Sequence, residues 1–295
     1  MDRRSFLASL VASSTPVLLG GSVLGCKSKA QKQAELAVTD LDGVLDVIEK
    51  RHVQGLARAL PQAAKDLGAK LAGVELDKEG VAFVAIRDKV DDLRSAKRSY
   101  FAVVDQGGEV QWVDDPNWPV VHRKIAIGFP AVQEVLDGKS TFAKGIGRYG
   151  GADEAATTFV EAAPLAKADG TKLGALVACW EAHDAAEDLR RQLLTQLLQK
   201  TAQPMKRVKA KDKLKLMLDQ PDVWVGIFRG QWLYLQEDAP QPLEEALQAL
   251  AFADKTKAGA WSGTFDVMNK GWGGAAKRVP SLGADVGVVV ARLDP

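Results

Sequence analysis

The sequence predicts an α+β protein in which a long N-terminal helix is followed by one or two antiparallel sheets flanked by helices. Three patterns lead to this prediction. Between residues 41 and 60, apolar residues recur at steps of three and four, which is helical spacing. Two apolar runs then flank a tight turn at residues 106–108, as in a β-hairpin. A comparable order of hairpin, helix and strands returns after residue 222.

The first 25 residues are typical of an export signal. Arg3 and Arg4 precede an uncharged, mostly apolar run over residues 6–24. The order Arg-Arg-x-Phe-Leu resembles the twin-arginine motif, whose machinery exports folded proteins. Asp2 and Ala8 depart from the residues that this motif prefers at its flanks. We therefore expect an export signal of the twin-arginine type.

The signal ends in Val-Leu-Gly-Cys at residues 23–26, which resembles the bacterial lipobox. In that motif the signal is cut before the cysteine, and the thiol takes a diacylglycerol. We expect lipid on Cys26 and a polar tether over residues 26–34. Each buried methylene of a lipid anchor contributes about 0.8 kcal/mol to membrane binding. The mature protein is expected on a bacterial membrane, facing the periplasm or the cell exterior. An ordinary signal peptide beside a chance cysteine is the alternative.

The composition after cleavage restricts the class of protein. The signal carries Asp2, Arg3 and Arg4, so its removal takes the formal net charge from +1 to 0. Without a basic excess to neutralise phosphates, no nucleic-acid partner is expected. Of the 2 cysteines, Cys179 alone remains after lipidation, so no internal disulfide can form. No later stretch approaches about 18 apolar residues, so no transmembrane helix is expected.

Helical patterns fill the chain before the first strand. The first helix is expected over residues 31–60, and Pro61 is expected to begin a new segment, because a proline disrupts a helix interior. Two further helical stretches follow, at 61–71 and 78–99. The apolar stripe of the first helix faces either its own domain or a second copy of the chain. A homodimer through this helix is therefore one of two expectations.

Two domains are predicted, at residues 35–203 and 204–295. After its helices, the first is expected to contain strands at 100–105 and 109–113, a helix near 130–136, strands at 157–165 and 172–180, and a helix at 182–203. The second is expected to contain strands at 223–228 and 231–236, a helix near 243–250, strands at 260–267 and 286–293, and a glycine-rich loop at 271–274. Similar letters precede the last strand of each domain, which suggests a repeat. The alternative is the general likeness of antiparallel α+β domains.

Residues 31–203 resemble the extracytoplasmic Cache domain, a PAS-like sensor. The resemblance depends on the long first helix and on the hairpin Phe-Ala-Val-Val-Asp-Gln-Gly-Gly-Glu-Val at 101–110. It also depends on 159–177, where Ala-Ala-Pro-Leu ends one strand, Asp-Gly-Thr forms a turn and a glycine begins the next strand. Residues 223–293 resemble a shorter second copy. The resemblance implies PAS/Cache-like antiparallel sheets that sense or hold a small molecule, with a protein partner for the output.

Catalytic motifs are not recognisable in this sequence. It contains no Gly-x-Ser-x-Gly, phosphate-binding loop, His-Glu-x-x-His or Cys-x-x-Cys pattern. We therefore expect no enzymatic activity, no cofactor and no metal site. Cys179 lies in an apolar strand pattern and is expected to be a buried small residue. A nucleophile–base pair with His183 is the alternative.

The connection at 114–149 is the candidate ligand-binding region, because the resemblance places the ligand against the sheet beneath it. An arginine fork binds a carboxylate, and aromatic rings exclude water from a pocket. The candidate ligand-binding residues are Trp118, Arg123, Arg148 and Tyr149. The alternative is a solvated loop in which Trp118 fills the core. The expected function is a membrane-anchored sensor or binding lipoprotein that acts through a partner. A structural lipoprotein without ligand is the other hypothesis.

Overall fold

The computed structural model describes residues 28–71, 76, 78–95, 100–115, 118, 120–147, 157–205 and 222–293. The expected export signal and Cys26 lie outside these residues. Within the described ranges, no helix combines the length and the apolar character needed to cross a membrane.

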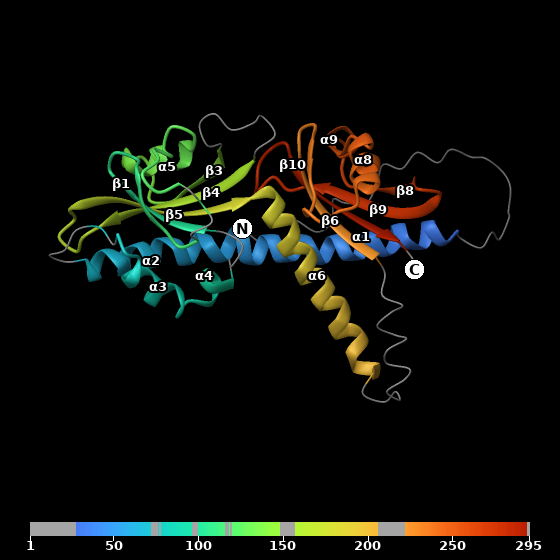
Figure 1. Cartoon of the computed structure of the whole chain (residues 1–295), viewed down its shortest axis with the longest axis horizontal. Helices are drawn as coiled ribbons and strands as arrows, with labels where there is room; N and C mark the ends of the chain where they lie inside the picture. Colours follow the sequence, from blue (N-terminus) through green and yellow to red (C-terminus); the bar gives the residue numbers. More distant parts are fainter. Residues whose placement is uncertain are drawn as a thin grey trace, which may run out of the picture.

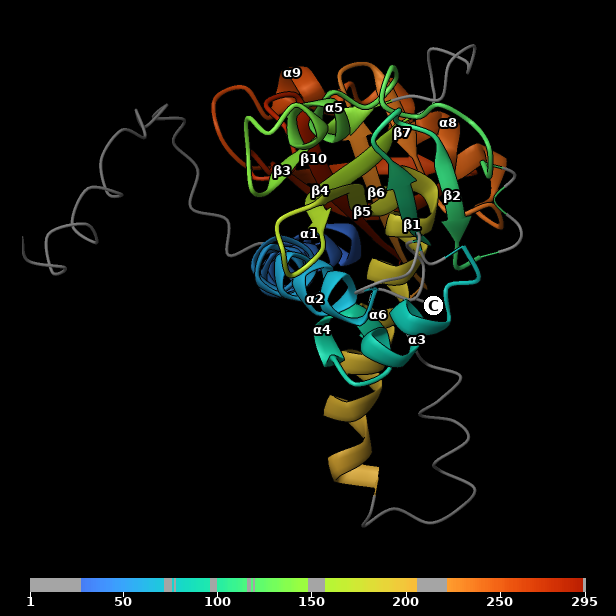
Figure 2. The same cartoon turned by 90° about the vertical axis from the view of Figure 1, so that its left-hand side faces the viewer.

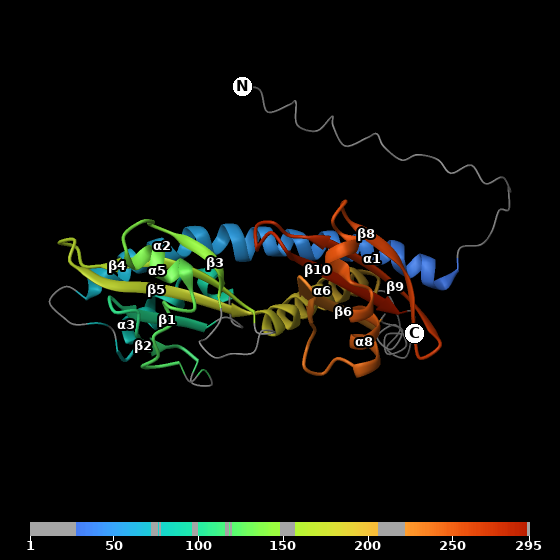
Figure 3. The ribbon, with the colours of Figure 1, turned by 90° about the horizontal axis from the view of Figure 1, so that it is seen from above.

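A long helical rod runs past both sheets of the molecule (Figures 1 and 3). It consists of helix α1 (Lys29–Val47), the π-helical segment η1 (Ile48–Gly55) and helix α2 (Leu56–Lys70). At its start, the Gln31 amide donates to the Ser28 hydroxyl at 3.2 Å, and the Ser28 amide donates to Gln31 Oε1 at 2.9 Å. This reciprocal pair is a capping box. The helix therefore begins at Lys29, inside the stretch expected to be a tether.

The expected break at Pro61 is wrong, because Pro61 lies inside α2. Its neighbour Leu60 is fully buried, and Leu67, about two turns later, is buried in the same cluster under the first sheet. This packing outweighs the roughly 3 kcal/mol that an interior proline costs. The expected helix at 78–99 is likewise wrong in its extent. It is divided into α3 (Val81–Arg87) and α4 (Asp91–Ser95).

The first sheet has five antiparallel strands in the order β2-β1-β5-β4-β3. They are β1 (Tyr100–Asp105), β2 (Val110–Val113), β3 (Ala143–Gly147), β4 (Thr158–Ala166) and β5 (Lys172–Glu181). Both expected hairpins are confirmed. Strand β3 was not expected from the sequence, because Ala-Lys-Gly-Ile-Gly is short and rich in glycine. Helix α5 (Pro130–Leu136) forms at the residues where a helix was expected. It covers the face of the sheet away from the rod (Figure 2).

The second sheet also has five antiparallel strands, in the order β7-β6-β10-β9-β8. They are β6 (Asp222–Arg229), β7 (Trp232–Tyr234), β8 (Trp261–Val267), β9 (Lys270–Arg278) and β10 (Val286–Leu293). Helices α8 (Gln241–Ala249) and α9 (Phe252–Lys255) come between its second and third strands. Numbered from its own first strand, each sheet has the order 2-1-5-4-3. The two sheets therefore share one topology.

The glycine-rich run at 271–274 is part of β9, so the expected loop is wrong. Helix α1 lies directly on this strand. A Cβ atom on Gly273 would lie 2.0 Å from the amide nitrogen of Ala34, far inside any normal contact. Glycine is required here because the backbones of the helix and the strand approach closely. The glycine run resembles a turn in the sequence, but its glycines allow the helix to pack closely on the strand.

The rod covers one face of both sheets. Helix α1 contacts β8, β9 and β10, whereas α2 contacts β4 and β5. Helix α6 (Ala182–Met205) follows β5 directly, packs against β6, and projects away from the sheets (Figures 1 and 2). One face of each sheet is therefore covered by the same helical rod, and the opposite face of each sheet is separate from that of the other.

A buried polar cluster attaches the last strand to the first helix. Arg292 of β10 donates through Nε to Gln33 Oε1 at 2.8 Å and through Nη1 to the Asp40 carboxylate. All three side chains are buried. Burial raises the pKa of Asp40, and the Arg292 guanidinium opposes this rise. The cluster joins residues that lie more than 250 positions apart in the chain.

His52 marks the junction of the rod with the first sheet and helix α6. Its ring stacks on Trp180 of β5, with 3.9 Å between ring centroids. Its Nε2 atom lies 3.9 Å from Asp188 Oδ2 of α6. Burial lowers the pKa of His52 to about 4, against the opposing effect of Asp188. The imidazole is therefore neutral at physiological pH.

Candidate functional site

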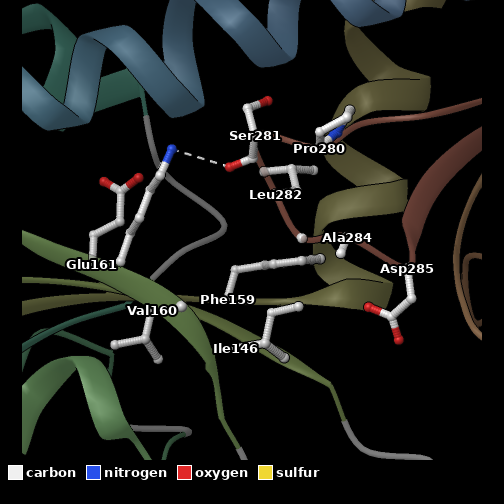
Figure 4. Close-up of a pocket in the computed structure, with 12 residues that line it drawn as sticks. Ile146, Phe159, Val160, Glu161, Pro280, Ser281, Leu282, Ala284 and Asp285 are labelled. Carbon is white, nitrogen blue, oxygen red and sulfur yellow. Dashed lines mark hydrogen bonds between the residues drawn. The ribbon is translucent and has the colours of Figure 1, made fainter.

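A cleft of about 310 Å³ lies where the two sheets meet (Figure 4). Strands β3 and β4 form one wall, and the turn at 280–285 before β10 forms the other. The residues that determine its chemistry are Lys144, Ile146, Phe159, Glu161, Leu282 and Asp285. The cleft is thus mainly apolar, with charged groups toward its ends.

Glu161 is the unusual group of this cleft. Burial raises the pKa of Glu161 to about 8, and the ammonium of Lys144 opposes this only in part. Its Oε2 atom is buried and has no hydrogen-bond partner among the described residues. Buried polar atoms nearly always have partners, because leaving one unpaired is costly. The carboxyl is therefore mostly protonated near neutral pH, and one of its oxygens is unsatisfied.

Lys144 joins the two walls. It faces Glu161 across the β3–β4 ladder. Its ammonium, however, donates to the carbonyl oxygen of Ser281 at 3.1 Å, the dashed line in Figure 4. Asp285, at the other end of the turn, lies 3.6 Å from Nε of Arg229. The Lys144 cation thus connects the two walls of the cleft and offsets only part of the effect of burial on Glu161.

Further polar contacts fix the sheets beside the cleft. The hydroxyls of Thr157 and Tyr234 lie 2.7 Å apart, and Arg229 Nη1 donates to Thr157 Oγ1 at 3.3 Å. His183 lies with Nδ1 2.6 Å from the carbonyl oxygen of Leu235. These contacts connect the end of the first sheet and the start of α6 with the second sheet.

The four residues predicted to bind ligand lie on the other side of the first sheet or outside the described ranges. Trp118 is half-buried and packs on Tyr100, with ring centroids 4.7 Å apart. Arg123 is exposed. Arg148 and Tyr149 lie outside the described residues. The structure thus brings Trp118 to the sheet and does not test the proposed arginine fork.

The outer face of the first sheet is largely filled by the side chains of the chain itself. Phe129 and Val132 of the α5 region are fully buried there, against Val177 of β5. The Tyr100 hydroxyl is buried in this region without a hydrogen-bond partner among the described residues. This face therefore combines a packed apolar core with one unsatisfied polar atom.

The other chemical candidates are accounted for by packing. Cys179 is fully buried in β5, as predicted. In the part of the chain that the structure describes, no three His, Cys, Asp or Glu side chains are grouped so that they could hold a metal ion. Glu161 was not among the residues expected to form a site. An acidic residue within the apolar strand pattern Thr-Phe-Val-Glu-Ala-Ala was the available signal.

No protein-family model matches this sequence, and no curated protein is similar to it in sequence. Among solved structures, it is similar to an extracellular ligand binding receptor from Desulfohalobium retbaense, at 12% identity and a TM-score of 0.50. That match covers 87% of this chain but 40% of the receptor chain. The sensor domain of the Vibrio cholerae histidine kinase DctB matches at 10% identity, a TM-score of 0.43, and 91% and 100% coverage.

The sensory domain of the Campylobacter jejuni chemoreceptor Tlp3, solved with isoleucine bound, matches at 10% identity and a TM-score of 0.43. That match covers 89% of this chain and 93% of the other. The fold class expected from the sequence is confirmed: α+β, with a long N-terminal helix and two antiparallel sheets flanked by helices. The chain shares its fold with a part of the extracellular ligand binding receptor.

Proposed function

We propose that this protein is a lipid-anchored sensor that binds a small molecule outside the cytoplasm and acts through a partner protein. The observation that carries the proposal is the unsatisfied, buried carboxyl of Glu161 in an apolar cleft between two sheets. A ligand in this cleft touches both sheets, so its binding energy favours one arrangement of the sheets over others. The likeness in fold to an extracellular ligand binding receptor supports the same role.

The cleft favours a ligand with a small apolar body and one polar group. Phe159 and Leu282 offer apolar walls, and Glu161 offers a carboxyl group. A protonated carboxyl donates one hydrogen bond, and an ionised one accepts from an amine. We propose binding rather than catalysis, because the sequence carries no catalytic motif.

A ligand screen tests the binding proposal. The mature protein is heated with small amines, amides and acids, and its melting temperature is compared with that of Glu161→Gln. We expect at least one class of compound to raise the melting temperature of the unaltered protein and to raise that of the variant less. The exposed Glu79→Gln is the matched control and should respond like the unaltered protein. If no compound shifts the melting temperature, ligand sensing loses its support.

A labelling experiment tests the anchor. Cells that produce the full chain are fed a fatty-acid analogue and fractionated. We expect Cys26→Ser to abolish labelling and to release the protein from the membrane fraction. Cys179→Ser is the control and should leave labelling intact, because that thiol is fully buried. Undiminished labelling of Cys26→Ser would rule out lipid on this cysteine.

A structural lipoprotein without ligand is the second candidate function. The filled outer face of the first sheet favours it, because a packed face leaves little room for a ligand there. The same screen separates the two candidates. A scaffold gains no stability from small molecules, whereas a sensor does.

A further inference from the structure

The second sheet ends in a long strand whose outer side is open. Strand β8 is the last strand of this sheet and lies next to the rod (Figure 3). Its 7 residues, Trp261–Val267, pair with β9 along their whole length without a register shift. In the described part of the chain, no other backbone segment is hydrogen-bonded to the outer side of β8. A row of backbone amides and carbonyls therefore faces outward.

The other edge strands of the two sheets are short or partly covered. Strand β7 has 3 residues and β2 has 4, and the loop at 122–123 is hydrogen-bonded to Val110 on the outer side of β2. Strand β3 has 5 residues and lies along the cleft, opposite the turn at 280–285. Proteins protect open edges with short strands, bulges, lysine or proline. Strand β8 has none of these features, so its edge is available for pairing.

The side chains of β8 alternate between a polar and an apolar face. Ser262, Thr264 and Asp266 are exposed on the face that carries the rod, because their partners in β9 include the glycines that meet α1. Trp261 and Phe265 are half-buried and pack on the core at the opposite face. A strand added to this edge therefore needs polar side chains toward the rod and apolar ones away from it.

A second copy of β8 fits this requirement. When two copies pair antiparallel about Thr264, every residue of the strand has a partner, and the two Thr264 side chains face each other. Ser262 of each copy lies opposite Asp266 of the other, so a hydroxyl can donate to a carboxylate on both sides of the axis. Phe265 lies opposite Gly263. No charge opposes a like charge, and about three or four of the residue pairs exchange two backbone hydrogen bonds each.

The rods leave room for this pairing. Helix α1 lies mainly on β9. Neighbouring strands are about 4.8 Å apart, so β9 and its copy lie about 14 Å apart with the two β8 strands between them. A helix with its side chains is about 10–12 Å wide. The two rods, which run in opposite directions, therefore pass side by side without overlap.

We propose that the open edge of β8 pairs with β8 of a second copy of this chain, so that two five-stranded sheets join in one antiparallel sheet. The apolar stripe of α1, which gave the earlier expectation of a homodimer, is buried on the chain's own sheets: Leu41 and Val44 are each 2% exposed. Pairing through β8 leaves this packing in place. It also uses no residue that lines the cleft.

Cysteine cross-linking tests the register. Opposed residues in an antiparallel pair have Cα atoms about 4.5–5.5 Å apart, within the range of a disulfide. The full chain carrying Thr264→Cys should therefore form a disulfide-linked dimer on oxidation. Ser262→Cys should not link to its own copy, about 13 Å away, but it should link to coexpressed Asp266→Cys. The unaltered chain, with its 2 cysteines, gives the baseline.

Two charge variants separate this edge from any other interface. Thr264→Lys places like charges opposite each other, so we expect the dissociation constant of the dimer to rise at least about tenfold. Ser262→Lys places a lysine opposite Asp266 on both sides of the axis, so we expect the dimer to tighten about threefold. Sedimentation equilibrium of the mature protein measures both changes. Both sites are exposed, and melting curves show whether each variant still folds.

The outcomes decide whether copies of the chain pair through β8. Cross-links in the expected register, with opposite effects of the two lysines, support the pairing. A chain that stays monomeric at every concentration, with no cross-link through Thr264→Cys, refutes it. A dimer that Thr264→Lys does not weaken forms through another surface and refutes it as well. Cross-linking of Thr264→Cys in cells to a different protein, without a self-linked dimer, shows that the edge takes a foreign strand instead.

Discussion

Gly273→Ala should separate the first helix from the second sheet. The added Cβ would lie 2.0 Å from the amide nitrogen of Ala34 and 2.3 Å from the carbonyl carbon of Gln33. Both are backbone atoms, so no rotamer change relieves the overlap. Normal contact requires about 3.5 Å, and α1 must therefore move outward by more than about 1 Å at this point.

The cost follows from what α1 buries on this sheet. Leu41 and Val44 are each 2% exposed, and each full burial contributes about 1.5–3 kcal/mol. A gap of about 1 Å forfeits up to about half of the dispersion contacts across it. With the strain of overpacking, we expect the free energy of unfolding to fall by about 3 kcal/mol.

Urea unfolding of the mature protein measures this change. The control is Gly145→Ala on β3, where a Cβ would lie 3.7 Å from Cβ of Ala131, an ordinary contact. We expect the control to change the free energy of unfolding by less than about 0.5 kcal/mol. If both variants unfold at the same urea concentration, α1 does not lie on β9 as described.

Three further predictions concern buried polar groups. Because the pKa of Glu161 is raised to about 8, the folded protein loses stability as pH rises from 4.5 to 8. At pH 8, Glu161→Gln should therefore be more stable than the unaltered protein, by at most about 5 kcal/mol. In melting curves, this difference should vanish near pH 4.5. Because the pKa of His52 is lowered to about 4, stability is lost as pH falls from 6.5 to 4; His52→Phe, which keeps a ring on Trp180, should flatten this loss. Arg292→Ala should lower the free energy of unfolding by about 3–5 kcal/mol, because it leaves Asp40 buried and unpaired. In urea unfolding, the double variant Asp40→Leu and Arg292→Met should recover most of the lost stability.

The fold was predictable where local patterns and packing agree. The hairpins at β1–β2 and β4–β5 combine apolar runs with Gly-containing turns, and both formed where expected. The predictions at Pro61 and at the glycines of β9 were wrong. Proline and glycine favour breaks and turns locally, but contacts with distant segments hold these residues in a helix and in a strand. No local pattern can show that Gly273 meets Ala34, since the two are far apart in the chain.

The candidate site was less predictable than the fold for the same reason. The cleft joins strands β3 and β4 with a turn that lies more than 100 residues later. In the sequence, Glu161 resembles the polar position of a half-exposed strand, and nothing local shows that the turn at 280–285 closes a cleft beside it. The predicted ligand residues came from the resemblance to a family and remain predictions.

The Arg292 cluster has a consequence for how the chain is made. Residues 33 and 40 are synthesised more than 250 residues before their partner Arg292. The surface of α1 that covers β9 and β10 therefore has to wait for these strands while the residues between them are made. Contacts of such long sequence separation form slowly. We therefore expect the docking of α1 on the second sheet to be a late step in folding.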